Sequence, residues 1–127
     1  MKITSFNPQI VAKDAAPIVQ FFEELGFERH HHKTDIGELN VANIQLKDPN
    51  GFKIDISQPE QFPVHMPADA VVCIRINVDD FEEAYALFTA RGFRNFYNDH
   101  EALTPTSRNV ILIAPSGFAV NLIKHIK

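Results

Sequence analysis

The chain has 127 residues, is 45% hydrophobic and carries a formal net charge of −4 at pH 7. This length suits a single domain that folds without disulfides or a structural metal. The negative charge and the lack of a Lys/Arg stretch argue against a nucleic-acid partner. No apolar run reaches the roughly 18 residues of a membrane span, and the first residues lack a signal-peptide core. With Cys73 as the single cysteine, we expect a cytoplasmic protein with no membrane partner.

The chain begins with the pattern of a strand followed by a helix. Residues 3–12 are rich in Ile and Val, which is typical of a strand, and Asp14 stands where a helix N-cap belongs. Gly26 supplies the residue that ends the helix. Apolar residues at a 3/4 spacing predict the buried helix face. These residues are Ile18, Phe21, Phe22 and Leu25.

Three short strands complete the first half. We expect strands at residues 28–33 and 39–47. Pro49-Asn50-Gly51 predicts the turn that folds back a closing strand, FKIDIS, whose apolar residues alternate with period two.

The second half repeats the first at an offset of 66 residues without a gap. The matches fall on the helix start, the helix stop and the hairpin turn, as a duplicated supersecondary unit requires. They predict strands at 71–78, 93–98 and 108–114, a closing strand FAVNLI, and a helix capped by Asp79 or Asp80 with Phe81, Ala84, Tyr85 and Phe88 on its buried face. Matched pairs include Ile10 and Ile76, Asp14 and Asp80, Phe22 and Phe88, Gly26 and Gly92, and Gly51 and Gly117.

The predicted fold class is therefore α+β, with two tandem βαβββ modules in one domain. Module one covers 1–58, a Pro-rich linker covers 59–69, and module two covers 70–127. One helix behind each four-stranded sheet leaves the other sheet face free. Since pockets favour interfaces between repeated units, we expect a ligand cleft between the two free faces.

The motifs on which this prediction depends resemble those of the vicinal oxygen chelate superfamily. The carrying segments are Ile10–Asp14, Phe22–Phe27 and the hairpin Asp48–Ile56, each repeated in the second half. That superfamily includes glyoxalase I, extradiol dioxygenases, fosfomycin-resistance enzymes and bleomycin-binding proteins. The resemblance covers nearly the whole chain and implies a concave mixed sheet of the glyoxalase/bleomycin-resistance type.

The resemblance also identifies the positions where metal-dependent members carry their His, Gln and Glu ligands. They lie seven residues before the helix-capping Asp and four residues past the turn Gly, at Asn7, Asp55, Cys73 and Asn121. Neutral amides bind catalytic divalent ions poorly, and one carboxylate with one thiol falls short of the three protein ligands of a catalytic zinc. We expect no metal and no other cofactor. A mixed site of Asp55, Cys73 and Gln9 stays open as an alternative.

Side-chain alternation adds neighbours to these four positions. Lys53, Asp55 and Arg75 form a partly charged cleft floor that suits a cationic or carboxylate-bearing ligand, or they satisfy one another through an Arg75–Asp55 ion pair. The predicted ligand-binding cleft comprises Asn7, Gln9, His31, Lys53, Asp55, Cys73, Arg75 and Asn121.

The histidine run, the cysteine and one proline could each have a functional role, but each also has a structural explanation. In a regular strand His31 points opposite to His30 and His32, so an exposed edge strand is favoured over a metal cluster. Cys73 is favoured as a small buried hydrophobe over a nucleophile. Pro8 cannot donate to a ladder, so its strand should be an edge or carry a bulge, which suits a homodimer like those of the bleomycin-binding branch.

The sequence as a whole favours a metal-independent binding protein for a small organic molecule, such as an antibiotic or an aromatic metabolite. The alternative is a metal-dependent lyase, isomerase or dioxygenase with an altered ligand set. A third interpretation is a protein whose cleft is filled by its own side chains and serves dimerisation only.

Overall fold

The computed structural model describes residues 1–36, 41–60, 69–96, 102–104 and 107–125. The chain divides into two compact units. The N-terminal unit is Asn7–Val72, and the C-terminal unit combines Met1–Phe6 with Cys73–Lys127. Within the described ranges, no helix is long and apolar enough to cross a membrane.

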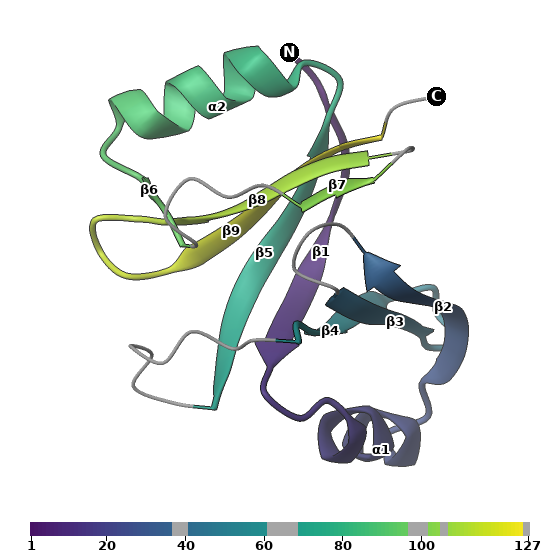
Figure 1. The fold of residues 1–127 in the computed structure, drawn as a ribbon. Coiled ribbons are helices and arrows are strands. Elements are labelled where there is room, and N and C mark those ends of the chain that lie inside the picture. The colour runs from purple at the N-terminus through teal and green to yellow at the C-terminus, as the bar shows by residue number, and fades with distance from the viewer. Residues whose placement is uncertain (37–40, 61–68, 97–101, 105–106, 126–127) are drawn as a thin grey trace. The chain divides into compact units, whose positions relative to one another are not determined.

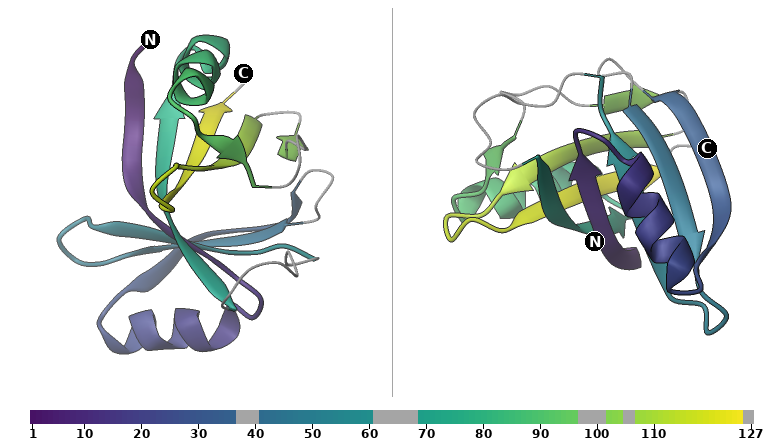
Figure 2. Two further views of the ribbon diagram at one scale, coloured as in Figure 1. Left: turned by 90° about the vertical axis from the view of Figure 1, so that its left-hand side faces the viewer. Right: turned by 90° about the horizontal axis from the view of Figure 1, so that it is seen from below.

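The N-terminal unit has the order β-α-β-β-β. Its strands are hydrogen-bonded in the order β2-β3-β4-β1, with β1 and β4 parallel and the other pairs antiparallel. Figures 1 and 2 show α1 on one face of these strands. The elements are β1 (Ile3–Ala12, which belongs to this unit from Asn7 onward), α1 (Ala16–Glu24), β2 (Glu28–Ile36), β3 (Val41–Lys47) and β4 (Lys53–Gln58).

The C-terminal unit repeats this plan with β5, β9, β8 and β6 in hydrogen-bonding order, and β5 and β9 are parallel. A short strand, β7, pairs with β8 and was not predicted from the sequence. The helix α2 covers one face of these strands (Figure 1). The elements are β5 (Ala70–Val78), α2 (Phe81–Ala90), β6 (Arg94–Asn95), β7 (Ala102–Thr104), β8 (Ser107–Ile113) and β9 (Ala119–His125).

The duplication extends to the register of the strands. Gln9 lies opposite Asp55 in the parallel pair of the N-terminal unit, and Arg75 lies opposite Asn121 in the C-terminal unit. Each residue of the second pair follows its counterpart by 66 positions. The predicted tandem βαβββ repeat is therefore confirmed.

The buried face of α2 is the predicted one, but that of α1 is not. Phe81 and Ala84 are buried, as predicted. On α1, Phe21 and Leu25 are 55% and 59% exposed, so their prediction as core residues was wrong. The helix instead packs through an i, i+3, i+4, i+7 set that begins one residue before it. The packed residues are Ala15, Ile18, Val19 and Phe22.

Pro8 does not make β1 an edge strand, because β1 lies between β4 and β5 in hydrogen-bonding order. The pairing with β4 begins at Gln9, one residue after Pro8. Pro8 also lies close to the boundary between the two units, which falls between Phe6 and Asn7. The edge prediction was wrong because the missing N–H of Pro8 precedes the ladder with β4 and interrupts none of its pairs.

The two helices differ in their N-terminal caps. Asp80 accepts a hydrogen bond from the Glu83 backbone N–H at 3.0 Å, which confirms one of the two predicted caps of α2. The N-cap of α1 is Ala15, with no side-chain cap, so the prediction of Asp14 was wrong by one residue. The Asp14 carboxylate reaches only the Ala16 N–H, at 3.3 Å.

This difference gives a matched pair of substitutions. Asp80→Ala should lower the free energy of unfolding by ~1 kcal/mol, the usual contribution of a side-chain cap. Asp14→Ala should lower it by less than ~0.5 kcal/mol, as for an ordinary surface residue. Urea unfolding followed by circular dichroism measures both. Equal losses would show that the two helices are capped alike, against the geometry observed.

Candidate functional site

The sheet face of the N-terminal unit that points away from α1 is polar, and we call it the polar face. Residues that pack on α1 occupy even positions of β1, β3 and β4, so the odd positions point to the opposite side. Four of them are buried although they are polar: Asn7, Gln9, Asp55 and Ser57. The polar face comprises Asn7, Gln9, His31, Asn43, Gln45, Lys53, Asp55 and Ser57.

Asp55 is the centre of this face. Its side chain is 1% exposed, and amide groups from both neighbouring strands donate to its carboxylate. Asn7 Nδ2 lies 2.7 Å from Oδ2, and Asn43 Nδ2 lies 2.9 Å from Oδ1. Gln45 Nε2 reaches both oxygens, at 3.5 and 3.4 Å. Both carboxylate oxygens are thus occupied by neutral donors, which is how a buried charge is stabilised in a protein interior.

A second chain of hydrogen bonds continues from this centre. Gln9 Nε2 donates to Ser57 Oγ at 2.7 Å, and the Ser57 hydroxyl donates to Asn43 Oδ1. Asn43 also donates to Asp55, which accepts from Asn7. One continuous hydrogen-bond network therefore connects Gln9, Ser57, Asn43, Asp55 and Asn7. Such a network fixes the orientation of each amide.

The predicted cleft residues of this unit share the polar face, but only some of them join the hydrogen-bond network. Asn7, Gln9 and Asp55 belong to the network, whereas Lys53 and His31 are exposed. Sequence reasoning missed Asn43 and Gln45 as partners of Asp55. Alternation along the predicted strand 39–47, combined with the hairpin register, was the signal that could have found them.

The histidine run of β2 differs from its predicted geometry. The ring centroids of His30 and His31 are 4.4 Å apart, which excludes the predicted arrangement on opposite faces. A register shift between Arg29 and His31 explains the difference, because a β-bulge turns one residue out of the alternation. The three histidines are exposed and their strand lies at the edge of the sheet, as predicted. No three His, Cys, Asp or Glu side chains are grouped as metal ligands in the ranges that the structure describes.

In the C-terminal unit, the predicted site residues lie on the sheet face opposite α2. Cys73 is 1% exposed and Asn121 is 5% exposed, while Arg75 is half-buried opposite Asn121. Burial raises the pKa of the Cys73 thiol to about 12. The thiol therefore stays protonated at neutral pH, and both metal binding and nucleophilic attack need the thiolate.

The donor groups do not fit the divalent ion that the resemblance implies. In the N-terminal unit, Asn7 presents its Nδ2 to Asp55, and an amide nitrogen is no metal ligand. In the C-terminal unit, Cys73 holds its proton. Asp55 is the single carboxylate among the four positions, whereas a catalytic zinc site takes three protein ligands.

Comparisons with known proteins identify the fold. No family model and no curated protein matches the sequence. Methylmalonyl-CoA epimerase from Mycobacterium tuberculosis is similar in structure with a TM-score of 0.66 at 16% identity, over 98% of this chain and 90% of that one. The Streptomyces coelicolor epimerase in complex with 2-nitronate-propionyl-CoA has a TM-score of 0.63 at 19% identity, over 99% and 100%.

A third similar structure is a glyoxalase/bleomycin resistance protein/dioxygenase superfamily member from Vibrio splendidus. It has a TM-score of 0.60 at 16% identity and covers 97% of this chain and 99% of its own. At these identities the likeness establishes the fold alone. The predicted glyoxalase/bleomycin-resistance-type fold is thereby confirmed.

The burial of the Cys73 thiol predicts slow chemical modification, which can be measured directly because the chain has a single cysteine. With a pKa of about 12, roughly one Cys73 thiol in 10⁴ is ionised at pH 8. Ellman's reagent should modify the native protein at least ~10³-fold more slowly than the same protein in guanidinium, where one thiol per chain should react. Fast stoichiometric reaction of the native protein at pH 8 would contradict the buried, protonated state.

Proposed function

We propose that this chain, which has the fold of the vicinal oxygen chelate superfamily, is a binding protein for a small organic molecule and works without a divalent metal. One observation carries the proposal. The carboxylate of Asp55, at a position where the resemblance implies a metal ligand, is buried and already accepts hydrogen bonds from three amides.

A metal at this carboxylate would have to displace those donors. A hydrogen bond to a charged group contributes about 1.5–3 kcal/mol, and Asn7 would also have to turn its amide to offer oxygen. The two corresponding positions of the C-terminal unit would add little binding free energy for a metal, because Cys73 is protonated and Asn121 is neutral. The donor chemistry therefore favours a cleft that recognises its ligand through hydrogen bonds.

The polar face suits this role because its polar groups are held in fixed orientations by one another. Small-molecule sites use a few well-placed polar groups to orient a ligand. The proposal extends to a cytoplasmic homodimer and to an antibiotic or an aromatic metabolite as the class of ligand. The residues proposed to bind it are Asn7, Gln9, His31, Lys53, Asp55, Cys73, Arg75 and Asn121.

Metal content is the direct test of the proposal. Protein purified without a polyhistidine tag and dialysed against Mn²⁺, Fe²⁺, Ni²⁺ or Zn²⁺ should contain far less than one metal ion per chain by mass spectrometry. Stoichiometric metal that is absent from Asp55→Asn would overturn the proposal in favour of a metal-dependent lyase, isomerase or dioxygenase.

Ligand binding should likewise be independent of metal. A thermal-shift screen of small aromatic compounds in EDTA should give a saturable rise in melting temperature, because a ligand at 100 times its Kd stabilises by about 2.7 kcal/mol. Asp55→Asn should weaken the effect, since its amide cannot accept all three hydrogen bonds. Glu24→Gln, which removes an exposed charge from α1, should leave it unchanged. Shifts that need added metal would contradict the proposal.

A further inference from the structure

We propose that a surface pocket of the N-terminal unit, between β2 and the end of β3, binds an oxyanion, the phosphate or carboxylate group of a small molecule. The groups that hold the anion are His30 and Lys47, with Lys53 adding charge nearby. This inference rests on the proposed function in one respect, because it names the charged group that a bound ligand would carry.

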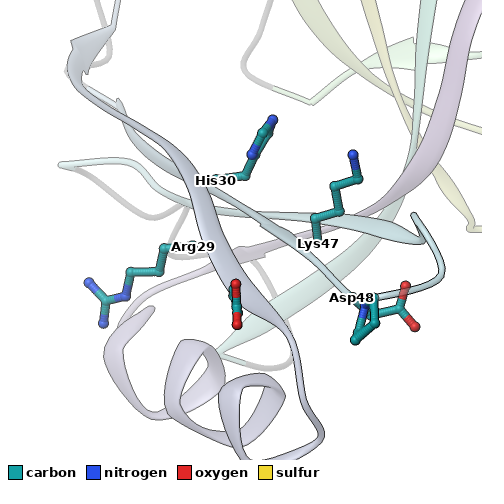
Figure 3. A pocket seen from close by; sticks show the side chains of 6 residues that line it. Arg29, His30, Lys47 and Asp48 are labelled. Carbon is teal, nitrogen blue, oxygen red and sulfur yellow. The ribbon is translucent and has the colours of Figure 1, made fainter.

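The pocket has a volume of about 280 Å³, several times that of one water molecule, and opens to solvent. Three consecutive residues at the start of β2 form one wall, and the end of β3 with the following turn forms the other. Figure 3 shows His30 and Lys47 projecting toward the same side from adjacent strands. The lining residues are Glu28, Arg29, His30, Lys47, Asp48 and Pro49.

The β-bulge of β2 places His30 in this position. Glu28 pairs with Lys47 and Arg29 with Leu46, but the next pair is His31 with Gln45, so His30 is the extra residue. Its ring lies against that of His31 with centroids 4.4 Å apart. Two imidazoles and one ammonium group thus gather at one edge of the sheet, and a bulge commonly re-aims a side chain for such a purpose.

Two other charges of the pocket, those of Asp48 and Arg29, are already engaged. The Asp48 carboxylate accepts the backbone N–H groups of Asn50 and Phe52 at 3.0 and 2.8 Å, and Figure 3 shows it turned away from His30 and Lys47. Arg29, which also projects elsewhere, pairs with Glu23 at 3.4 Å. The Asp48 carboxylate therefore stabilises the turn between β3 and β4, and Arg29 forms an ion pair with α1.

The environment of His30 shows that positive charge prevails around it. Desolvation first, and then the charges of His31, Lys47 and Lys53, lower the pKa of the His30 imidazole. Those three groups come from β2, β3 and β4, and Glu28 is the lining carboxylate that opposes them. An oxyanion in the pocket would favour the protonated imidazole and raise its pKa. Binding should therefore take up a proton and strengthen as the pH falls through the histidine range.

The test is a titration with inorganic phosphate, and separately with acetate, at constant ionic strength, with the histidine resonances followed by NMR. The His30 resonances, assigned with His30→Gln, should shift saturably, and the pKa of His30 should rise in the presence of the anion. Binding of phosphate alone identifies a phosphoryl group as the ligand chemistry, and binding of acetate alone or of both identifies a carboxylate or a general oxyanion. No saturable shift with either anion overturns the inference.

Three substitutions separate a specific site from a general effect of net charge. Lys47→Gln should weaken binding two- to fivefold, the range for an exposed charge pair, and Glu28→Gln should tighten it by a similar factor. Lys13→Gln makes the same charge change as Lys47→Gln at an exposed position outside the pocket and should have no effect. Equal losses for the two lysines would overturn the inference. A metal found at Asp55 would overturn the proposed function yet leave this measurement standing, because it requires neither metal nor organic ligand.

Discussion

The burial of one carboxylate, that of Asp55, constrains the whole N-terminal unit. A buried charge is tolerated only when its hydrogen bonds are made, so β1 and β3 must both lie beside β4 with their amides at the right level. A slip of one residue in either pairing would turn those amides to the helix side and place apolar residues against the charge. The register of this sheet and the chemistry of its polar face therefore have a common cause.

The C-terminal unit shows what the same geometry does with other residues. Asn121 and Ile111 occupy the places that Asp55 and Gln45 hold in the N-terminal unit, and the registers agree. The duplicated backbone thus carries a charged centre in one unit and a neutral residue in the other. Cys73, which corresponds to Asn7, is kept protonated by burial, and Arg75, two residues further along β5, brings a positive charge to this face. Similar backbones consequently give the two faces different affinities for charged groups.

Sequence reasoning succeeded where spacing decides the structure and failed where tertiary contact does. The glycines at 26, 51, 92 and 117 all have positive φ, and the order of helices and strands along the chain, apart from β7, followed from the repeat. The buried face of α1 could have been found from α2, since Ala15, Ile18, Val19 and Phe22 lie 66 residues before Phe81, Ala84, Tyr85 and Phe88. The amide partners of Asp55 could be predicted only with the register of β3 and β4. The run of three histidines contains no signal for the β-bulge at His30.

The Asp55 carboxylate on β4 and the histidines of β2 lie on opposite sides of β3. Gln45 lies opposite both His31 on β2 and Asp55 on β4, so a neutral amide stands between the imidazole and the carboxylate. Two strand spacings amount to roughly 10 Å. An anion held at His30 would thus feel only weak repulsion from Asp55, whose charge is already satisfied by amide donors. A ligand with an anionic end and a hydrogen-bonding body matches this order of groups along the sheet.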